Sequence, residues 1–105
     1  MENLEYKINQ VAFEIAQFLD KTEINKLLGV LASDGVYAMW VYAKAKKDIM
    51  ESELYGKLKS ILDISNYEDY EQYFQKLSED INELLFRKEL IEQALIYARY
   101  HAKAK

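Results

Sequence analysis

Few side chains in this chain have the type and spacing that catalysis or metal binding needs. His101 is the only histidine, and a general acid or base needs a partner to orient it within a pocket. Glu79 and Glu83 share a helix face at i and i+4 and could form part of a carboxylate metal site. Di-iron bundles, however, need Glu-x-x-His from two helices, which one histidine cannot supply. We therefore expect no enzyme activity, no metal and no cofactor.

Basic residues gather in two places, after an apolar stretch at 35–43 and near the C-terminal end. The helix macrodipole favours cations at helix C-termini, so both clusters can be ordinary helix ends. Alternatively, they form one stripe along a phosphate backbone, with Trp40, Tyr97 and Tyr100 as stacking neighbours. The candidates for nucleic-acid binding are Lys44, Lys46, Lys47, Arg99 and Lys103.

The segment 66–86 carries six acids against one base, Lys76, and holds aromatic residues at helical spacing. The aromatic residues can pack in the core or against a partner, or serve as a platform for nucleobases. Tyrosine is enriched at protein interfaces because it offers a large contact area with few rotatable bonds. The candidates for a protein interface are Tyr67, Tyr70, Tyr73, Glu68 and Glu71.

Length and composition indicate one soluble domain, residues 1–105, with a formal net charge of −4. The absence of cysteine excludes disulfides and fits a reducing cytoplasm. No uncharged run approaches the roughly 20 residues that cross a bilayer, and Met1–Glu5 lacks the order of a signal peptide. We expect a cytoplasmic protein with no membrane contact. The acidic balance argues against an autonomous nucleic-acid-binding domain.

Zero prolines, only three glycines and charges at helical spacing predict an all-α protein. We expect a compact single-domain bundle of five to six helices around a buried central helix. That central helix is the uncharged segment Gly35–Ala43, because a helix that is apolar all round is buried all round. Trp40 is then a core residue.

Capping residues and periodicity place the helix boundaries. Whether residues 67–104 form one bent helix or two is open. The expected helices are Asn3 (cap) to Asp20, Thr22 (cap) to Ala32, Asp34 to Ile49, Ser52 to Asp63, Asn66 (cap) onward, and Ser78 or Glu79 to Lys103.

Two segments resemble a known family. The polar-Gly turn and apolar helix at Leu31–Lys44, and the aromatic and basic end of Arg87–Ala104, are similar to the small helical subunit of type III-B (Cmr) CRISPR effector complexes. The resemblance covers roughly residues 27–47 and 87–104. It implies a non-catalytic subunit that stacks in copies beside other subunits and braces guide and target RNA. Contacts to the RNA backbone would position the duplex without reading its sequence.

A different class of function is also open. A small acidic helical protein rich in tyrosine can be a protein-interaction module without nucleic acid, such as a regulator, an inhibitor or a viral accessory protein. The acidic segment 66–86 would then be the working surface and would dock on a basic partner.

Overall fold

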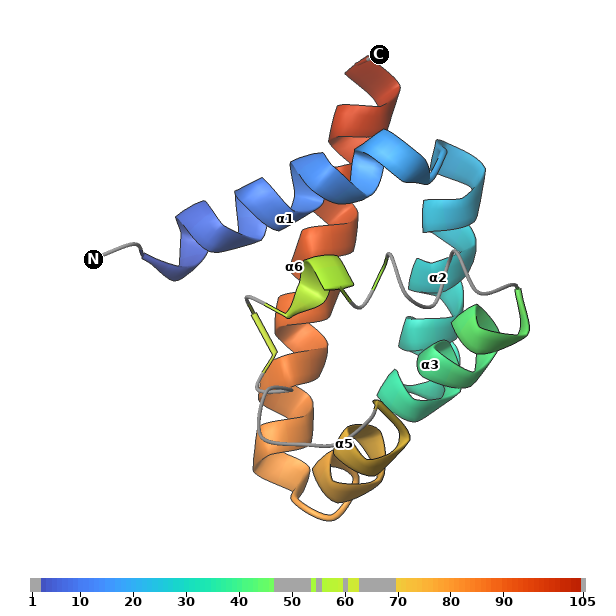
Figure 1. Cartoon of the computed structure of the whole chain (residues 1–105), viewed down its shortest axis with the longest axis vertical. Coiled ribbons are helices and arrows are strands. Elements are labelled where there is room, and N and C mark those ends of the chain that lie inside the picture. The colour runs from blue at the N-terminus through green and yellow to red at the C-terminus, as the bar shows by residue number, and fades with distance from the viewer. Residues whose placement is uncertain (1–2, 47–53, 55, 60, 63–69, 105) are drawn as a thin grey trace.

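Every regular element in the described part of the chain is helical, which confirms the all-α prediction. The computed structural model describes residues 3–46, 54, 56–59, 61–62 and 70–104 (Figure 1). Residues 54 and 56–58 are helical as well. The labelled helices are α1 (Leu4–Phe18), α2 (Lys21–Asp34), α3 (Val36–Ala45), α5 (Tyr70–Leu77) and α6 (Ile81–Ala104).

The long helix α6 forms the axis of the bundle. Figure 1 shows α1 crossing it and α2, α3 and α5 lying to one side of it. Its buried residues recur at helical spacing and face α1 and α2, with which it makes its most extensive contacts. Alanines on both α1 and α6 allow the two helices to approach closely. The buried residues of the pair are Ile8, Val11, Ala12, Ile15 and Ala16 on α1, and Leu90, Ile91, Ala94, Leu95 and Ala98 on α6.

The boundary between α1 and α2 is set by a capping box. Asp20 accepts a hydrogen bond of 2.8 Å from the backbone N–H of Glu23, and the Glu23 carboxylate accepts one of 3.1 Å from the Asp20 N–H. The prediction that Thr22 caps this helix is therefore wrong. A box that began at Thr22 would need a carboxylate at Asn25, whereas Asp20 has Glu23 at the required spacing. The cap predicted at Asn3 is confirmed, since its side chain accepts a bond of 2.7 Å from the Tyr6 N–H.

A single residue, Gly35, separates α2 from α3. Its φ of 97° lies in the region that favours glycine. Its N–H donates to the Leu31 carbonyl at 3.1 Å, and its own carbonyl accepts from the Met39 N–H at 3.0 Å. Helix α2 therefore continues through Asp34, beyond the predicted end at Ala32, and Asp34 does not begin α3.

Helix α3 lies at the edge of the bundle and buries one face only (Figure 1). Val36, Met39, Trp40 and Ala43 point into the core, which confirms the assignment of Trp40, whereas Val41 is 45% exposed. The prediction that this segment is buried all round is thus wrong. Tyr37 and Tyr42 are half-buried against the core, so only part of α3 is exposed, and α6 forms the axis of the bundle instead.

An aromatic cluster joins α3 to α5. The ring of Trp40 lies 5.6 Å from that of Tyr37 and 5.8 Å from that of Phe74, and Phe74 packs against Tyr73 at 5.0 Å. The Trp40–Tyr37 and Tyr73–Phe74 pairs are edge-on, an arrangement that the ring quadrupoles favour. This cluster attaches α3 and α5 to each other on the side of the bundle away from α1.

Helices α5 and α6 are separate helices joined by a turn, which answers the question that the sequence leaves open. The Ser78 hydroxyl donates to the Phe74 carbonyl at 2.9 Å, and the Asp80 N–H donates to the Leu77 carbonyl at 3.2 Å. Helix α6 begins at Ile81, two or three residues after the predicted start. Helix α3 ends at Ala45, so the prediction that it runs to about Ile49 is wrong. The predicted start Ser52, the predicted end Asp63 and the predicted cap Asn66 lie outside the described residues.

The aromatic cluster gives a stability prediction. Trp40 is 2% exposed, so Trp40→Ala should lower the free energy of unfolding by about 3–5 kcal/mol. The matched control on the same helix is Val41→Ala, which should change it by less than about 1 kcal/mol. Urea denaturation followed by circular dichroism measures both. A Trp40→Ala variant as stable as Val41→Ala would contradict the burial of this ring between α3 and α5.

Candidate interaction surface

The first predicted basic cluster lies at the end of α3. Lys44 Nζ is 4.9 Å from the centroid of the Trp40 ring, and Lys46 Nζ is 5.3 Å from that of Tyr42. Such cation–π contacts stabilise exposed sites by about 0.5–1 kcal/mol. Both lysines are exposed, and Lys47 lies outside the described residues. These contacts give Lys44 and Lys46 a role within the fold that needs no nucleic acid.

The second basic cluster lies in the last turns of α6. Arg99 Nη1 donates to Asn25 Oδ1 at 3.2 Å and so links α6 to α2, while Lys103 is exposed. The end of α3 and the C-terminal end of α6 lie in separate parts of the molecule (Figure 1). The described candidate bases therefore do not form one continuous stripe. Trp40, predicted as a stacking neighbour in that stripe, is buried.

The acidic and aromatic candidates are largely engaged within the fold. Tyr73 is buried, which corrects its assignment to a protein interface, and Tyr70 is half-buried. The Glu71 carboxylate accepts hydrogen bonds from the Tyr37 hydroxyl at 3.1 and 3.3 Å and from Gln75 Nε2 at 3.2 Å. Glu71 therefore fastens α5 to α3. Tyr67 and Glu68 lie outside the described residues.

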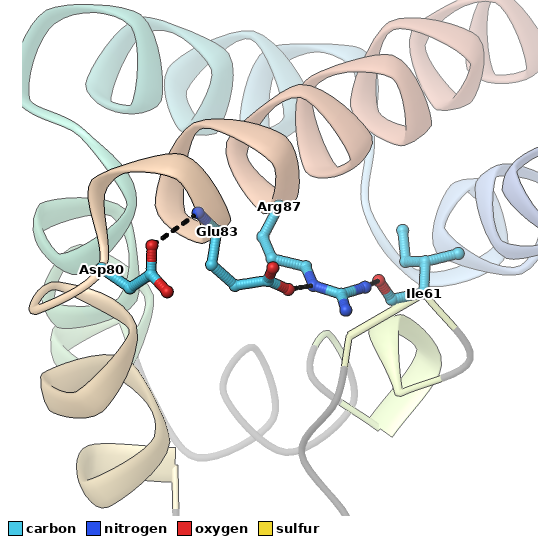
Figure 2. A network of polar contacts seen from close by, with 4 residues as sticks. All are labelled: Ile61, Asp80, Glu83 and Arg87. Atoms are coloured by element: carbon cyan, nitrogen blue, oxygen red, sulfur yellow. Dashed lines mark hydrogen bonds and ion pairs between the residues drawn. The ribbon is translucent and has the colours of Figure 1, made fainter.

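The remaining described acids of segment 66–86 also have partners within the chain. Figure 2 shows Asp80 accepting from the Glu83 N–H at 3.2 Å, Glu83 accepting from Arg87 Nε at 2.8 Å, and Arg87 Nη1 donating to the Ile61 carbonyl at 3.1 Å. Glu79 lies 4.0 Å from Lys76 in an exposed pair. These contacts cap the start of α6 and hold the chain at Ile61 against it. The described acids Glu71, Asp80 and Glu83 thus stabilise the fold.

The outer side of α6 carries an apolar surface that the core does not use. Residues spaced three or four positions apart form a row on the side of α6 that faces away from its buried residues. We call this row the outer stripe. Ile81 is 62% exposed, Leu85 55% and Tyr100 59%, while Ile96 is half-buried. Two apolar pairs, Ile81 with Leu85 and Ile96 with Tyr100, flank the two acidic residues of the row. Exposed apolar side chains that lie close together mark binding surfaces more often than isolated ones do. The outer stripe consists of Ile81, Leu85, Glu89, Glu92, Ile96 and Tyr100.

A groove of about 320 Å³ runs beside the outer stripe, between the first turns of α1 and the middle of α6. Phe86, at 45% exposure, lies at its edge, and Glu89 belongs to both the groove and the stripe, so the two features are continuous. Its floor is mainly apolar and its rim carries two carboxylates. The lining residues are Leu4, Glu5, Ile8, Phe86, Glu89, Leu90, Gln93 and Tyr97.

The sequence contains a signal for this surface. Leu84, Leu85 and Phe86 are consecutive, and three consecutive residues of an α-helix cannot share one face. Leu84 packs against the core, whereas Leu85 and Phe86 are exposed. An apolar run of this kind in an otherwise amphipathic helix predicts a second apolar side.

The described residues contain no cluster of three histidine or acidic side chains that could hold a metal ion. His101 packs edge-on against Phe13, with ring centroids 5.7 Å apart, and so has an aromatic neighbour. No helix among the described residues is long and apolar enough to span a membrane. No family model, no curated protein and no solved structure matches this chain.

The bond between α3 and α5 gives the next prediction. Tyr37→Phe removes the donor to the Glu71 carboxylate and should lower the free energy of unfolding by about 1–2 kcal/mol, because hydrogen bonds to charged groups are stronger than neutral ones. Tyr100→Phe removes a hydroxyl from an exposed ring and should change it by less than about 0.5 kcal/mol. Thermal melts that show equal effects for the two variants would refute a role for this bond.

The basic clusters are tested by the salt dependence of RNA binding. If these residues contact an RNA backbone, substituting glutamine at Lys44, Lys46, Lys47, Arg99 and Lys103 should reduce the slope of log K against log salt by about 0.7 to 0.9 for each phosphate that is no longer neutralised. Because bonds to the RNA backbone carry no sequence information, unrelated RNA duplexes should be affected equally. Fluorescence anisotropy on the chain within its native assembly measures the slope. An unchanged slope would identify these residues as ordinary helix-end bases.

Proposed function

We propose that this chain is a non-catalytic helical module that binds a helix of another protein along the outer side of α6. The observation that carries the proposal is that α6 has apolar side chains on two opposite sides. One side builds the core through Ile91 and Leu95, and the other exposes Ile81, Leu85 and Tyr100. A surface helix of a protein that works alone has a polar outer face instead.

The size and composition of the surface suit a helical partner. The outer stripe runs over about 29 Å at a rise of 1.5 Å per residue, which matches five turns of a second helix. Aromatic anchors carry much of the energy of many protein interfaces. Phe86 lies at the edge of the groove and Tyr100 is an exposed ring in the outer stripe. An amphipathic helix that lays its apolar face into a groove is a recurring recognition mode.

The rest of the fold supports α6 as a rigid binding element. Its inner face is packed against α1 and α2, Arg99 links it to Asn25, and Arg87 links it to the Ile61 carbonyl. A partner would therefore meet a helix that is already ordered, and little conformational entropy would be lost on this side of the interface.

A protein partner suits this surface better than a phosphate backbone does. Glu5 and Glu89 border the groove and Glu92 lies in the stripe, so the surface repels anions. The described candidate bases, Lys44, Lys46, Arg99 and Lys103, lie at the ends of α3 and α6. The RNA-guided assembly stays a prediction, and a subunit of such an assembly could use the same outer side of α6 for a neighbouring subunit.

The proposal is tested by photo-crosslinking in the cells that express the chain. A benzophenone amino acid at position 85 or at position 100 should give adducts with the same protein, mapped by mass spectrometry to one amphipathic helical segment. The same probe at Lys76, an exposed residue of α5, should not give that adduct. The adduct from position 100 should disappear when Leu85→Asp is introduced, since an aspartate there interrupts the apolar surface.

Two results would refute the proposed function. One is an identical set of adducts from positions 76, 85 and 100, which would indicate nonspecific contact. The other is the absence of an adduct from both stripe positions in a chain whose circular dichroism matches the wild type.

A further inference from the structure

The middle of the outer stripe is acidic. Glu89 and Glu92 lie between two apolar pairs, Ile81 with Leu85 and Ile96 with Tyr100. Within the described part of the chain neither carboxylate forms an ion pair, in contrast to Glu83, which is bound by Arg87 at 2.8 Å. The polarity of α6 is therefore arranged as apolar, acidic, apolar along its outer side.

This arrangement discriminates between partners. A helix that covers the apolar ends must also cover the two carboxylates, and a carboxylate that loses water without gaining a partner is costly. A second copy of this chain, paired antiparallel along α6, would bring four carboxylates together at the centre of the interface. Like charges at that distance oppose association, so the arrangement disfavours pairing of the chain with itself.

Resting on the proposed function above, we propose that the partner helix carries two lysines or arginines at the centre of its apolar face. The partner helix can run parallel or antiparallel to α6. In either orientation its bases lie opposite Glu89 and Glu92, and its apolar residues contact the two apolar pairs of the outer stripe. Glu5, on the far rim of the groove, faces the same space as Glu89 and attracts a further base on the flank of the partner. The partner class is a basic-centred amphipathic α-helix.

The chain itself supplies the probe for this proposal. In Glu89→Lys/Glu92→Lys, α6 has the polarity apolar, basic, apolar, which is the chemistry expected of the partner. Wild type mixed with this variant should form a one-to-one pair, whereas each protein alone should stay monomeric at the same concentration. Sedimentation equilibrium should give about twice the chain mass of 12.4 kDa for the mixture and the single mass for each component.

Charge complementarity and apolar contact make separate contributions that variants can distinguish. Adding Leu85→Asp to the lysine variant should weaken pairing with the wild type at least about tenfold, because the apolar end of the stripe is interrupted. Raising the salt to 1 M should also weaken it, since the screening length falls to roughly 3 Å.

The matched control for net charge is Glu14→Lys/Asp34→Lys, which reverses two acids away from α6. Either double variant changes the net charge from −4 to 0, because two reversals add four positive units to the wild-type charge. The control should not pair with the wild type. The single variant Glu89→Lys provides a second probe should the double variant show an altered circular dichroism spectrum.

Three outcomes would overturn the inference: no pairing in the mixture with either lysine probe, pairing of the wild type with itself as strong as in the mixture, or equal pairing by the charge control. The crosslinking experiment separates this inference from the proposed function. Adducts from positions 85 and 100 that map to a helix without central bases would leave the proposed function standing and refute the charge pattern. The absence of those adducts would refute both.

Discussion

The packing of α6 against α1 fixes the position of the other described helices. Alanines at 12, 16, 94 and 98 are fully buried in this contact and let the two backbones come close, while Ile15, Ile91 and Leu95 fill the space beside them. Helix α2 then covers the remaining inner surface of α6, and α3 and α5 attach further out through the aromatic rings around Trp40. Figure 1 shows α1 crossing the C-terminal half of α6, and on the side of α6 away from its buried residues Ile81, Leu85 and Tyr100 stay exposed.

The sequence predicts what depends on neighbours along the chain. The absence of proline and the helical spacing of apolar residues indicate an all-α fold, and the Asn3 cap and the glycine break at Gly35 follow from side-chain and backbone chemistry that acts within four residues. The choice between Asp20 and Thr22 as a cap was predictable too, because the carboxylate at Glu23 has the correct spacing from Asp20 alone.

What the sequence does not predict is which faces of the helices meet. The absence of charge over residues 35–43 permits full burial but does not require it, and Val41 is exposed because no described helix covers the outer face of α3. The same limit applies to the candidate site. Lys44 and Arg99 have similar charge and similar places near helix ends, but their positions in space depend on how α3 and α6 pack, which neither local sequence encodes. Glu71 was a surface candidate by composition, and only its tertiary contact with Tyr37, 34 residues away, reveals a structural role.

Some acidic side chains stabilise the fold, whereas others remain available to a partner. Asp20, Glu71, Asp80 and Glu83 each accept a hydrogen bond that caps a helix or joins two parts of the chain, so their charge is used inside the fold. Glu89 and Glu92 have no such contact within the described residues, and they interrupt an apolar row in which leucine or isoleucine would extend the exposed surface. An uninterrupted row would favour association of the chain with itself, since nothing in it would distinguish one apolar helix from another. The two carboxylates therefore lower the affinity of α6 for apolar helices in general and for a second copy of the chain in particular. A helix with complementary bases is the partner for which the desolvation of these carboxylates costs the least free energy.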